Sequence, residues 1–264
     1  MGDSRPLGIL DSGLGGLSVL LELRAQLPSE DLLYYGDSAH CPYGGRPLEF
    51  ILDRSSTIAD HLVERGAKLL IVACNTASTV ALAHLRARHK VPIVGMVPAV
   101  KPAAAATRSG RIGVIATPRT VTGEALAGLI REHARGVEVY TTAGHGWVQL
   151  VEGGCVTGPE VTATLRRVVC PLVELGVDTL VLGCTHYPFL RTPLQSLVGP
   201  GVSLIDSGEA VARRTADVLL RRNLLTSRHV EGKLELLTSG DSEHVSEVAS
   251  RLLGEPVRAT TVAL

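Results

Sequence analysis

Residues 62–76 read LVERGAKLLIVACNT, and residues 172–186 read LVELGVDTLVLGCTH. In both stretches a helix end and a glycine lead into an apolar run that closes on a cysteine, Cys74 in the first and Cys184 in the second. Glycine commonly ends helices, and a short apolar run between turn residues is typical of a buried strand. The repeat therefore predicts two related half-domains, each with a cysteine where a buried strand stops.

The two cysteines have a geometric consequence. Half-domains that face each other would bring the thiols to one cleft from opposite sides. This arrangement suits a reaction in which one face of a carbon loses a proton and the other face gains one. Cysteine is also a common small buried residue, and that interpretation suits Cys170, inside a predicted helix, and Cys155. Cys74 and Cys184 differ because hydroxyl and amide side chains accompany them at matching strand ends.

Composition favours an α/β protein. The chain has 264 residues, of which 45% are apolar and only 3% aromatic. A core rich in Ala, Val, Leu and Gly is typical of parallel sheets that are buried on both faces. Lys plus Arg and Asp plus Glu both number 26, so a nucleic-acid partner, which needs a basic excess, is not expected.

Targeting signals and cysteine usage indicate the compartment. No apolar run approaches the ~18–20 residues of a membrane span, so no membrane partner is expected. The first residues, MGDSRPLGIL, lack the basic-then-apolar layout of a signal peptide. Five cysteines, an odd number, fit a reduced cytoplasmic setting.

Strand and helix patterns alternate along the chain, which predicts parallel sheets. Strands are predicted at 7–10, 32–35, 69–73, 92–96, 113–117, 137–141, 179–183, 233–238 and 257–262. Helices are predicted at 17–27, 48–66, 76–89, 121–133, 159–175, 209–222 and 242–253, with 95–110 as the crossover between the halves. The tail is expected to return to the first half. The predicted domains are therefore 1–97 plus 208–264, which is discontinuous, and 98–207.

Polar residues follow the predicted strands, where parallel α/β sheets bind their ligands. They are Asp11-Ser12, the turn from Asp37 to Gly45, Cys74-Asn75-Thr76, Thr117 and Cys184-Thr185-His186. The glycines at 13, 15 and 16 match a dinucleotide-binding loop only in part, because Ser18 stands at the third glycine position. Such a turn still offers N–H groups to a carboxylate.

Acid–base partners for the thiols are also present. A free thiol has a pKa of roughly 8.5, and a nearby imidazole raises its thiolate fraction. His186 stands two residues after Cys184 and is a candidate for that role. Asp11 is a second candidate, although it is also suited to capping the turn that follows. Glu152 is a further carboxylate, in a predicted loop. No metal site is expected, because the chain has neither CxxC nor HxxxH spacing.

Four motifs resemble the signature blocks of glutamate racemases, which belong to the aspartate/glutamate racemase superfamily. These motifs are ILDSGLGGLSV (9–19), YYGDSAHCPYG (34–44), IVACNTAS (71–78) and VLGCTHYP (181–188). The resemblance implies two α/β domains with pseudo-twofold symmetry and an active site at their interface. It implies interconversion of L- and D-glutamate without a cofactor, D-glutamate supply for peptidoglycan, and a homodimer.

The same resemblance implies roles for single residues. Cys184 would deprotonate L-glutamate and Cys74 would deprotonate D-glutamate. Asp11 would assist Cys74, while His186, with Glu152, would assist Cys184. The substrate contacts would be Asp11, Ser12, Tyr43, Gly44, Asn75, Thr76, Thr117, Thr185 and His186. One departure from many relatives is His40, where they have Arg.

Three alternatives remain at this point. A racemase for aspartate or a hydantoin would use the same chemistry in a pocket of different size. A redox protein would cycle a disulfide between Cys74 and Cys184. A nucleotide-binding module would use the glycine turn, although the duplicated cysteine strands have no purpose in it.

Overall fold

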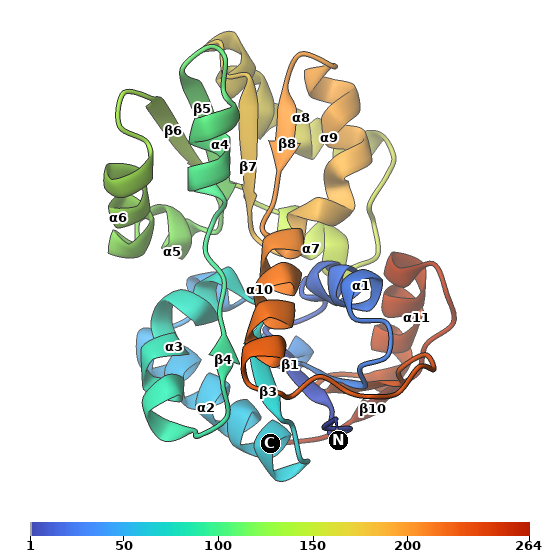
Figure 1. Cartoon of the computed structure of the whole chain (residues 1–264). Coiled ribbons are helices and arrows are strands. Elements are labelled where there is room, and N and C mark those ends of the chain that lie inside the picture. Colours follow the sequence, from blue (N-terminus) through green and yellow to red (C-terminus); the bar gives the residue numbers. More distant parts are fainter. Residues whose placement is uncertain (1) are drawn as a thin grey trace. The chain divides into compact units, whose positions relative to one another are not determined.

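The chain forms two compact units, each with its own sheet, in a computed structural model that describes residues 2–264 (Figure 1). The first unit runs up to Met96 and resumes over Gly208–Leu264, and the second is Val97–Ser207. Every strand pair in both sheets is parallel. The α/β class predicted from the sequence is therefore confirmed.

The first sheet has the order β10-β9-β2-β1-β3-β4. Its strands are β1 (Leu7–Asp11), β2 (Leu32–Gly36), β3 (Leu69–Val72), β4 (Ile93–Val94), β9 (Leu234–Thr238) and β10 (Ala259–Thr261). Every residue of β1, β2 and β3 is buried, as expected for a central strand covered on both faces.

Helices cover both faces of this sheet. They are α1 (Leu17–Gln26), α2 (Leu48–Glu64), α3 (Asn75–Arg88), α10 (Gly208–Arg221) and α11 (Ser242–Leu253). Helix α2 packs against α3, whereas α1 packs against α10 and α11. Figure 1 shows these two groups on opposite sides of the strands. Right-handed crossovers from β1 to β2 and back across to β3 require this division.

The second sheet has the order β6-β5-β7-β8. Its strands are β5 (Arg111–Ala116), β6 (Glu138–Ala143), β7 (Thr179–Gly183) and β8 (Ser203–Ile205). Its helices are α4 (Val100–Ala106), α5 (Pro118–Val121), α6 (Glu124–His133), α7 (Trp147–Glu152), α8 (Pro159–Glu174) and α9 (Arg191–Val198). The predicted crossover at 95–110 thus contains a helix, α4, which packs against α6 and β7.

The sequence repeat reappears as a repeat of topology. In the first sheet β1 lies between β2 and β3, with β4 next to β3, and in the second β5 lies between β6 and β7, with β8 next to β7. The two stretches that end in Cys74 and Cys184 form β3 and β7, the equivalent strands of the two sheets. Both cysteines therefore follow the carboxyl end of a fully buried inner strand.

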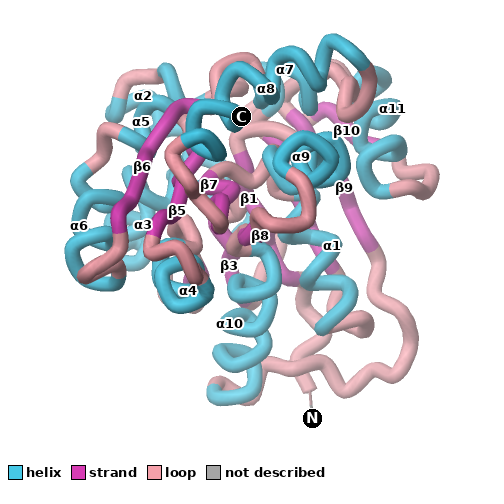
Figure 2. The backbone as a smooth tube through the Cα atoms, turned by 90° about the horizontal axis from the view of Figure 1, so that it is seen from above, coloured by secondary structure: helices cyan, strands magenta, loops and turns pink. Residues whose placement is uncertain are grey.

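The last part of the chain completes the first unit. An extended loop joins α10 to β9, which pairs with β2 (Figure 2). A buried ion pair holds this loop, because Lys68 Nζ lies 2.5 Å from Glu30 Oε2 and the Thr226 N–H donates to Glu30 Oε1 at 2.8 Å. None of the helices within residues 2–264 has the length and apolar character that crossing a membrane requires.

Candidate active site

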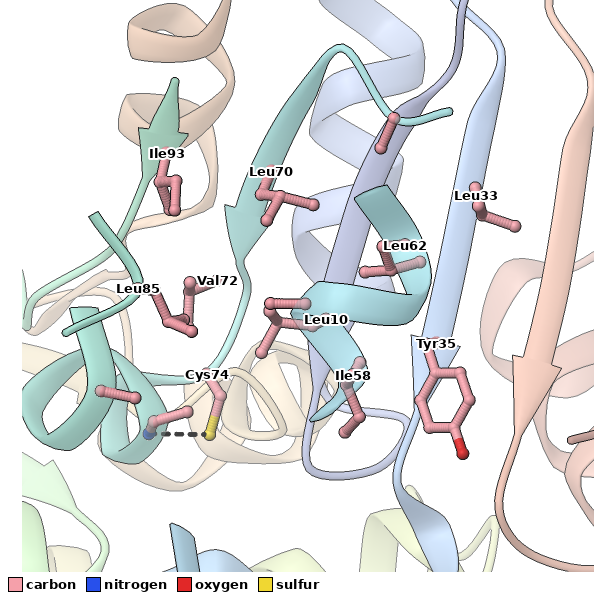
Figure 3. Close-up of a cluster of buried hydrophobic side chains, with 14 of the residues drawn as sticks. Leu10, Leu33, Tyr35, Ile58, Leu62, Leu70, Val72, Cys74, Leu85 and Ile93 are labelled. Atoms are coloured by element: carbon pink, nitrogen blue, oxygen red, sulfur yellow. Dashed lines mark hydrogen bonds between the residues drawn. The ribbon is translucent and has the colours of Figure 1, made fainter. Parts of the chain in front are cut away.

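Cys74 lies at the junction between β3 and α3. It is the N-cap residue of α3, and its Sγ accepts a hydrogen bond from the Ala77 N–H at 3.5 Å (Figure 3). The thiol also donates to Ser12 Oγ at 3.6 Å, and the residue is only 6% exposed. The sulfur therefore lies at a helix N-terminus, whose N–H groups favour negative charge.

Asp11 ends β1 beside Cys74's strand and is completely buried. Its Oδ2 accepts hydrogen bonds from the N–H groups of Gly13 at 3.2 Å and Gly16 at 2.9 Å. The Tyr34 hydroxyl is 3.3 Å from the same oxygen. The glycine turn therefore binds the chain's own Asp11 carboxylate through these two N–H groups, as the capping role considered for Asp11 requires.

Asn75 and Thr76 form the first turn of α3 and are buried. Within the described residues, Asn75 Oδ1 is buried without a hydrogen-bond partner. An unsatisfied buried acceptor costs about 1–3 kcal/mol. The amide oxygen is therefore suited to a donor group on a bound ligand.

Tyr43 and Gly44 lie in a short turn, Tyr43–Gly45, and both are buried. The Tyr43 hydroxyl donates to Asp37 Oδ2 at 2.6 Å. Arg54, from α2, donates to both oxygens of the same carboxylate, at 3.0 and 2.7 Å. His40 Nδ1 lies 2.9 Å from Asp37 Oδ1. Asp37, which follows β2, therefore ties this turn to α2.

In the second unit, Cys184 follows β7 and is also 6% exposed. Its Sγ lies 3.5 Å from Nδ1 of His186, and Nε2 of that ring lies 2.6 Å from Glu152 Oε1. His186 is 2% exposed. The sequence interpretation of Glu152 as a loop residue was wrong, because it is the last residue of α7. A thiol, an imidazole and a carboxylate thus form a hydrogen-bonded series, the arrangement that activates a thiol for proton transfer.

Buried aromatic residues surround this series. Tyr187 is fully buried, and its hydroxyl lies 3.2 Å from the carbonyl oxygen of Ala116 and 3.3 Å from that of Gly144. Its ring meets that of Trp147, the first residue of α7, with centroids 4.8 Å apart. This contact fixes α7 and hence the position of Glu152. Burial raises the pKa of Tyr187 well above its ordinary value, and the nearby Cys184 raises it further.

Comparisons with known proteins identify the family. The Asp/Glu/Hydantoin racemase family model matches residues 17–215. A glutamate racemase from Herpetosiphon aurantiacus is 47% identical, over 92% of this chain and 96% of its own length. The chain belongs to the Asp/Glu/Hydantoin racemase family, among the glutamate racemases.

Solved structures of glutamate racemases are also similar in fold. The one from Bacillus anthracis has a TM-score of 0.88 at 32% identity, with 98% of both chains covered. The one from Escherichia coli, in complex with L-glutamate and the activator UDP-MurNAc-ala, has a TM-score of 0.86 at 34% identity, with 98% of both chains covered. As a member of this group the chain is an isomerase, specifically an amino-acid racemase.

The remaining candidate residues of this racemase are distributed between the two units. Ser12 follows β1 and contacts Cys74, whereas Thr185 lies between Cys184 and His186 and is 4% exposed. Thr117 is the N-cap residue of α5, and its hydroxyl lies 3.0 Å from that of Thr120. Thr120 was not predicted from the sequence. The only local indication of its contact with Thr117 was the separation of three residues, which suits an N-cap and the first helical turn.

The other cysteines differ from one another in exposure. All five cysteines are free thiols in the part of the chain that the structure describes. Cys170 lies in α8 and is partly buried. Cys155 was expected to be buried, but it is exposed because it lies just beyond the helix end at Gly153. These two residues are therefore suitable controls for substitutions of Cys74 and Cys184.

Asp37 makes the stability of this racemase depend on pH. Burial alone would raise the pKa of its carboxyl, but hydrogen bonds from Arg54, Tyr43 and His40 outweigh burial and lower that pKa to about 2. A lowered folded-state pKa stabilises the fold above the ordinary pKa of 3.8, and this contribution disappears as pH falls toward 2. We expect the unfolding free energy to lose about 2 kcal/mol from this group over that interval.

Urea titrations of the wild type and Asp37→Asn, repeated from neutral pH down to about pH 2, would measure this contribution. The variant lacks the titrating carboxyl, so its stability should fall less over the acid interval. Equal losses in both proteins would contradict the expectation.

Proposed function

We propose that this chain interconverts L- and D-glutamate without a cofactor, through proton transfer between Cα and two thiols, Cys74 and Cys184. The observation that carries the proposal is the pair of cysteines at equivalent strand ends, each with its own polar neighbours. Relatives named glutamate racemase, matched over most of both chains, support glutamate as the substrate.

The chemistry requires stabilisation of a carbanion. The α-proton of an amino acid is very weakly acidic, so negative charge that develops on the carboxylate must meet preorganised donors. Candidates for this role are the hydroxyls of Ser12, Thr76, Thr117 and Thr185 and the N–H groups of the Tyr43-Gly44 turn. The proposed mechanism keeps the substrate amine protonated, because its positive charge stabilises the adjacent carbanion. The buried Asn75 Oδ1 is a suitable acceptor for that ammonium group.

Proton transfer then proceeds between sulfur and carbon. For L-glutamate, the Cys184 thiolate takes the α-proton and the Cys74 thiol delivers another to the opposite face. For D-glutamate the two roles are reversed. The proposal requires both sulfur atoms to reach the same carbon from opposite sides, and it requires one thiol to be ionised while the other stays protonated.

The two thiols have different surroundings. Cys184 has an imidazole within 3.5 Å, and that ring is backed by the Glu152 carboxylate. Cys74 has a hydroxyl and the N-terminus of α3 instead, with the buried Asp11 on the neighbouring strand. An imidazole backed by a carboxylate can exchange a proton with Cys184, whereas a helix N-terminus and a carboxylate lie near Cys74.

The cellular role follows from the product. We propose that the enzyme supplies D-glutamate for peptidoglycan synthesis and works in the cytoplasm, where a reducing environment keeps both thiols free. The resemblance to glutamate racemases also leads us to propose a homodimer. Sedimentation velocity of the purified protein at several concentrations would test the dimer.

One experiment tests the reaction and the substrate together. The purified protein is incubated with L-glutamate in deuterated water, and optical rotation and proton NMR are followed. We expect the rotation to fall to zero while deuterium replaces hydrogen at Cα of the D-glutamate that forms. If aspartate or a hydantoin is racemised in preference to glutamate, the substrate is not glutamate. If deuterium enters Cα of none of these compounds, the proposal is wrong.

A further inference from the structure

The loop between β2 and α2 has little regular structure of its own. It contains two short 3₁₀ turns, Ser38–His40 and Tyr43–Gly45. The Asp37 carboxylate, which has no exposed surface, anchors the loop from the protein interior. On the outer side, the Phe50 ring of α2 meets the Tyr43 ring at 6.4 Å between centroids and the His40 ring at 5.5 Å. The loop is therefore held between one buried charge and one helix.

Arg54 is the counter-ion of Asp37. Its guanidinium donates through Nε and Nη2 to the two carboxylate oxygens, and its side chain is 12% exposed. A third donor, Nη1, reaches the carbonyl oxygen of Leu264 at 2.6 Å. A two-point pair of this kind fixes the orientation of both groups. The direction of the Asp37 oxygens, and so of the Tyr43 ring, is set by α2.

The anchored turn, Tyr43–Gly45, packs against α3, the helix whose N-cap residue is Cys74. Tyr43 and Cys74 belong to the same buried cluster, together with Ala77 of α3. Burial raises the pKa of the Tyr43 phenol far above its ordinary value, with additional effects from Asp37 and from Cys74. A displacement of the turn would therefore change the surroundings of one of the two proposed acid–base groups.

The Tyr43 hydroxyl has one proton to donate, and Asp37 receives it at 2.6 Å. That proton is not available for a hydrogen bond to substrate. The turn can still donate hydrogen bonds to the substrate through its backbone N–H groups. We propose that Asp37, with Arg54 as counter-ion, is a positioning residue that holds the Tyr43-Gly44 turn beside Cys74, and that the Tyr43 hydroxyl acts on Asp37 and not on the substrate. This inference rests on the proposed racemisation of glutamate.

The test is a double-mutant cycle with Asp37→Asn, Tyr43→Phe and the double variant, measured with both glutamate enantiomers. Because Asp37→Asn loosens a substrate-binding turn, its KM should rise about tenfold or more, with a smaller fall in kcat. Tyr43→Phe should raise KM by a few-fold. The double variant should match Asp37→Asn within about twofold, because both changes break the same contact.

A matched control separates positioning from general loss of stability. The Lys68–Glu30 pair lies in the same unit and is as deeply buried, with 0% and 2% of the side chains exposed. Glu30→Gln should destabilise the unit without raising KM. If Asp37→Asn does not fold, Arg54→Lys replaces it in the cycle, because lysine keeps the charge and loses the two-point geometry.

Two results would overturn the inference. The first is a double variant whose change in KM equals the product of the changes in the two single variants. Independent effects of this kind mean that the Tyr43 hydroxyl acts separately on the substrate. The second comes from backbone NMR spectra. If the amide chemical shifts of Tyr43 and Gly44 in Asp37→Asn, or in Arg54→Lys, equal those in Glu30→Gln, the turn has not been displaced and Asp37 does not position it. The NMR result needs no activity, so it decides on Asp37 even if the wild type fails to racemise glutamate, which would overturn the proposed function alone.

Discussion

Cys74→Ala and Cys184→Ala should each lower the rate of glutamate racemisation by roughly 10³-fold or more, because each removes a group that no other side chain can replace in the proton transfer. Both sulfur atoms lie in buried surroundings, at 6% exposure, so water does not easily take over their role. Circular dichroism of D- and L-glutamate mixtures over time would measure the rates. Thermal melting of each variant would show whether it remains folded.

The two variants should also differ from each other. Cys74→Ala keeps the thiol that is proposed to act on L-glutamate, so it should exchange the α-hydrogen of the L enantiomer with deuterated water and leave its configuration intact. Cys184→Ala should do the same with D-glutamate only. Cys155→Ala and Cys170→Ala are the controls and should racemise at the wild-type rate. Full activity in either Cys74→Ala or Cys184→Ala would contradict the two-thiol mechanism.

His186→Asn should lower racemisation by about 10²- to 10⁴-fold, the usual contribution of an acid–base group. Asparagine cannot pass a proton between the Cys184 thiol, 3.5 Å from Nδ1, and the Glu152 carboxylate, 2.6 Å from Nε2. The loss should be specific to the steps at Cys184. The primary isotope effect should therefore rise with L-[2-²H]glutamate and not with D-[2-²H]glutamate.

His145→Asn is the matched control, because His145 is exposed in the same unit. It should leave both the rate and the isotope effects unchanged. If His186→Asn raised the isotope effects equally for the two enantiomers, the pairing of His186 with Cys184 in catalysis would be wrong.

The repeated cysteine stretches correctly predicted one buried inner strand of each sheet. A glycine after a helix and a run of buried aliphatic residues are local signals, and they became β3 and β7 with both cysteines at the strand ends. The same rule pointed to Asp11, the last residue of β1, and to Thr117, which follows β5. Strand ends are accessible to sequence reasoning because the pattern of a fully buried strand is short and continuous.

Glu152 shows where this reasoning stops. Its helix, α7, has six residues between Gly146, which has a φ of 81°, and Gly153, and six residues are too few for a helical period to be recognised. The helix is fixed by Trp147 packing on Tyr187, a contact between residues far apart in the chain. Nothing local to Glu152 predicted that its carboxylate would reach His186.

Prediction of the Asp37 network from the sequence had the same limitation. The turn after β2 was recognised as a strand end, but Arg54 stands 17 positions later in the middle of an amphipathic helix. An arginine there is typical of a solvated helix face. Only the packing of α2 on the sheet turns it inward, where the buried Asp37 requires a counter-ion.

The discontinuity of the first unit has a consequence for biosynthesis. A ribosome makes the whole second unit, Val97–Ser207, before it reaches β9 and β10. Domains usually fold as units once their residues have emerged, so the second unit can complete its fold while the first still has β2 as an open edge. The Ser239 hydroxyl, which accepts from the Ala39 N–H at 3.1 Å, arrives with β9. The Asp37 loop therefore gains this contact only after the whole second unit has been synthesised.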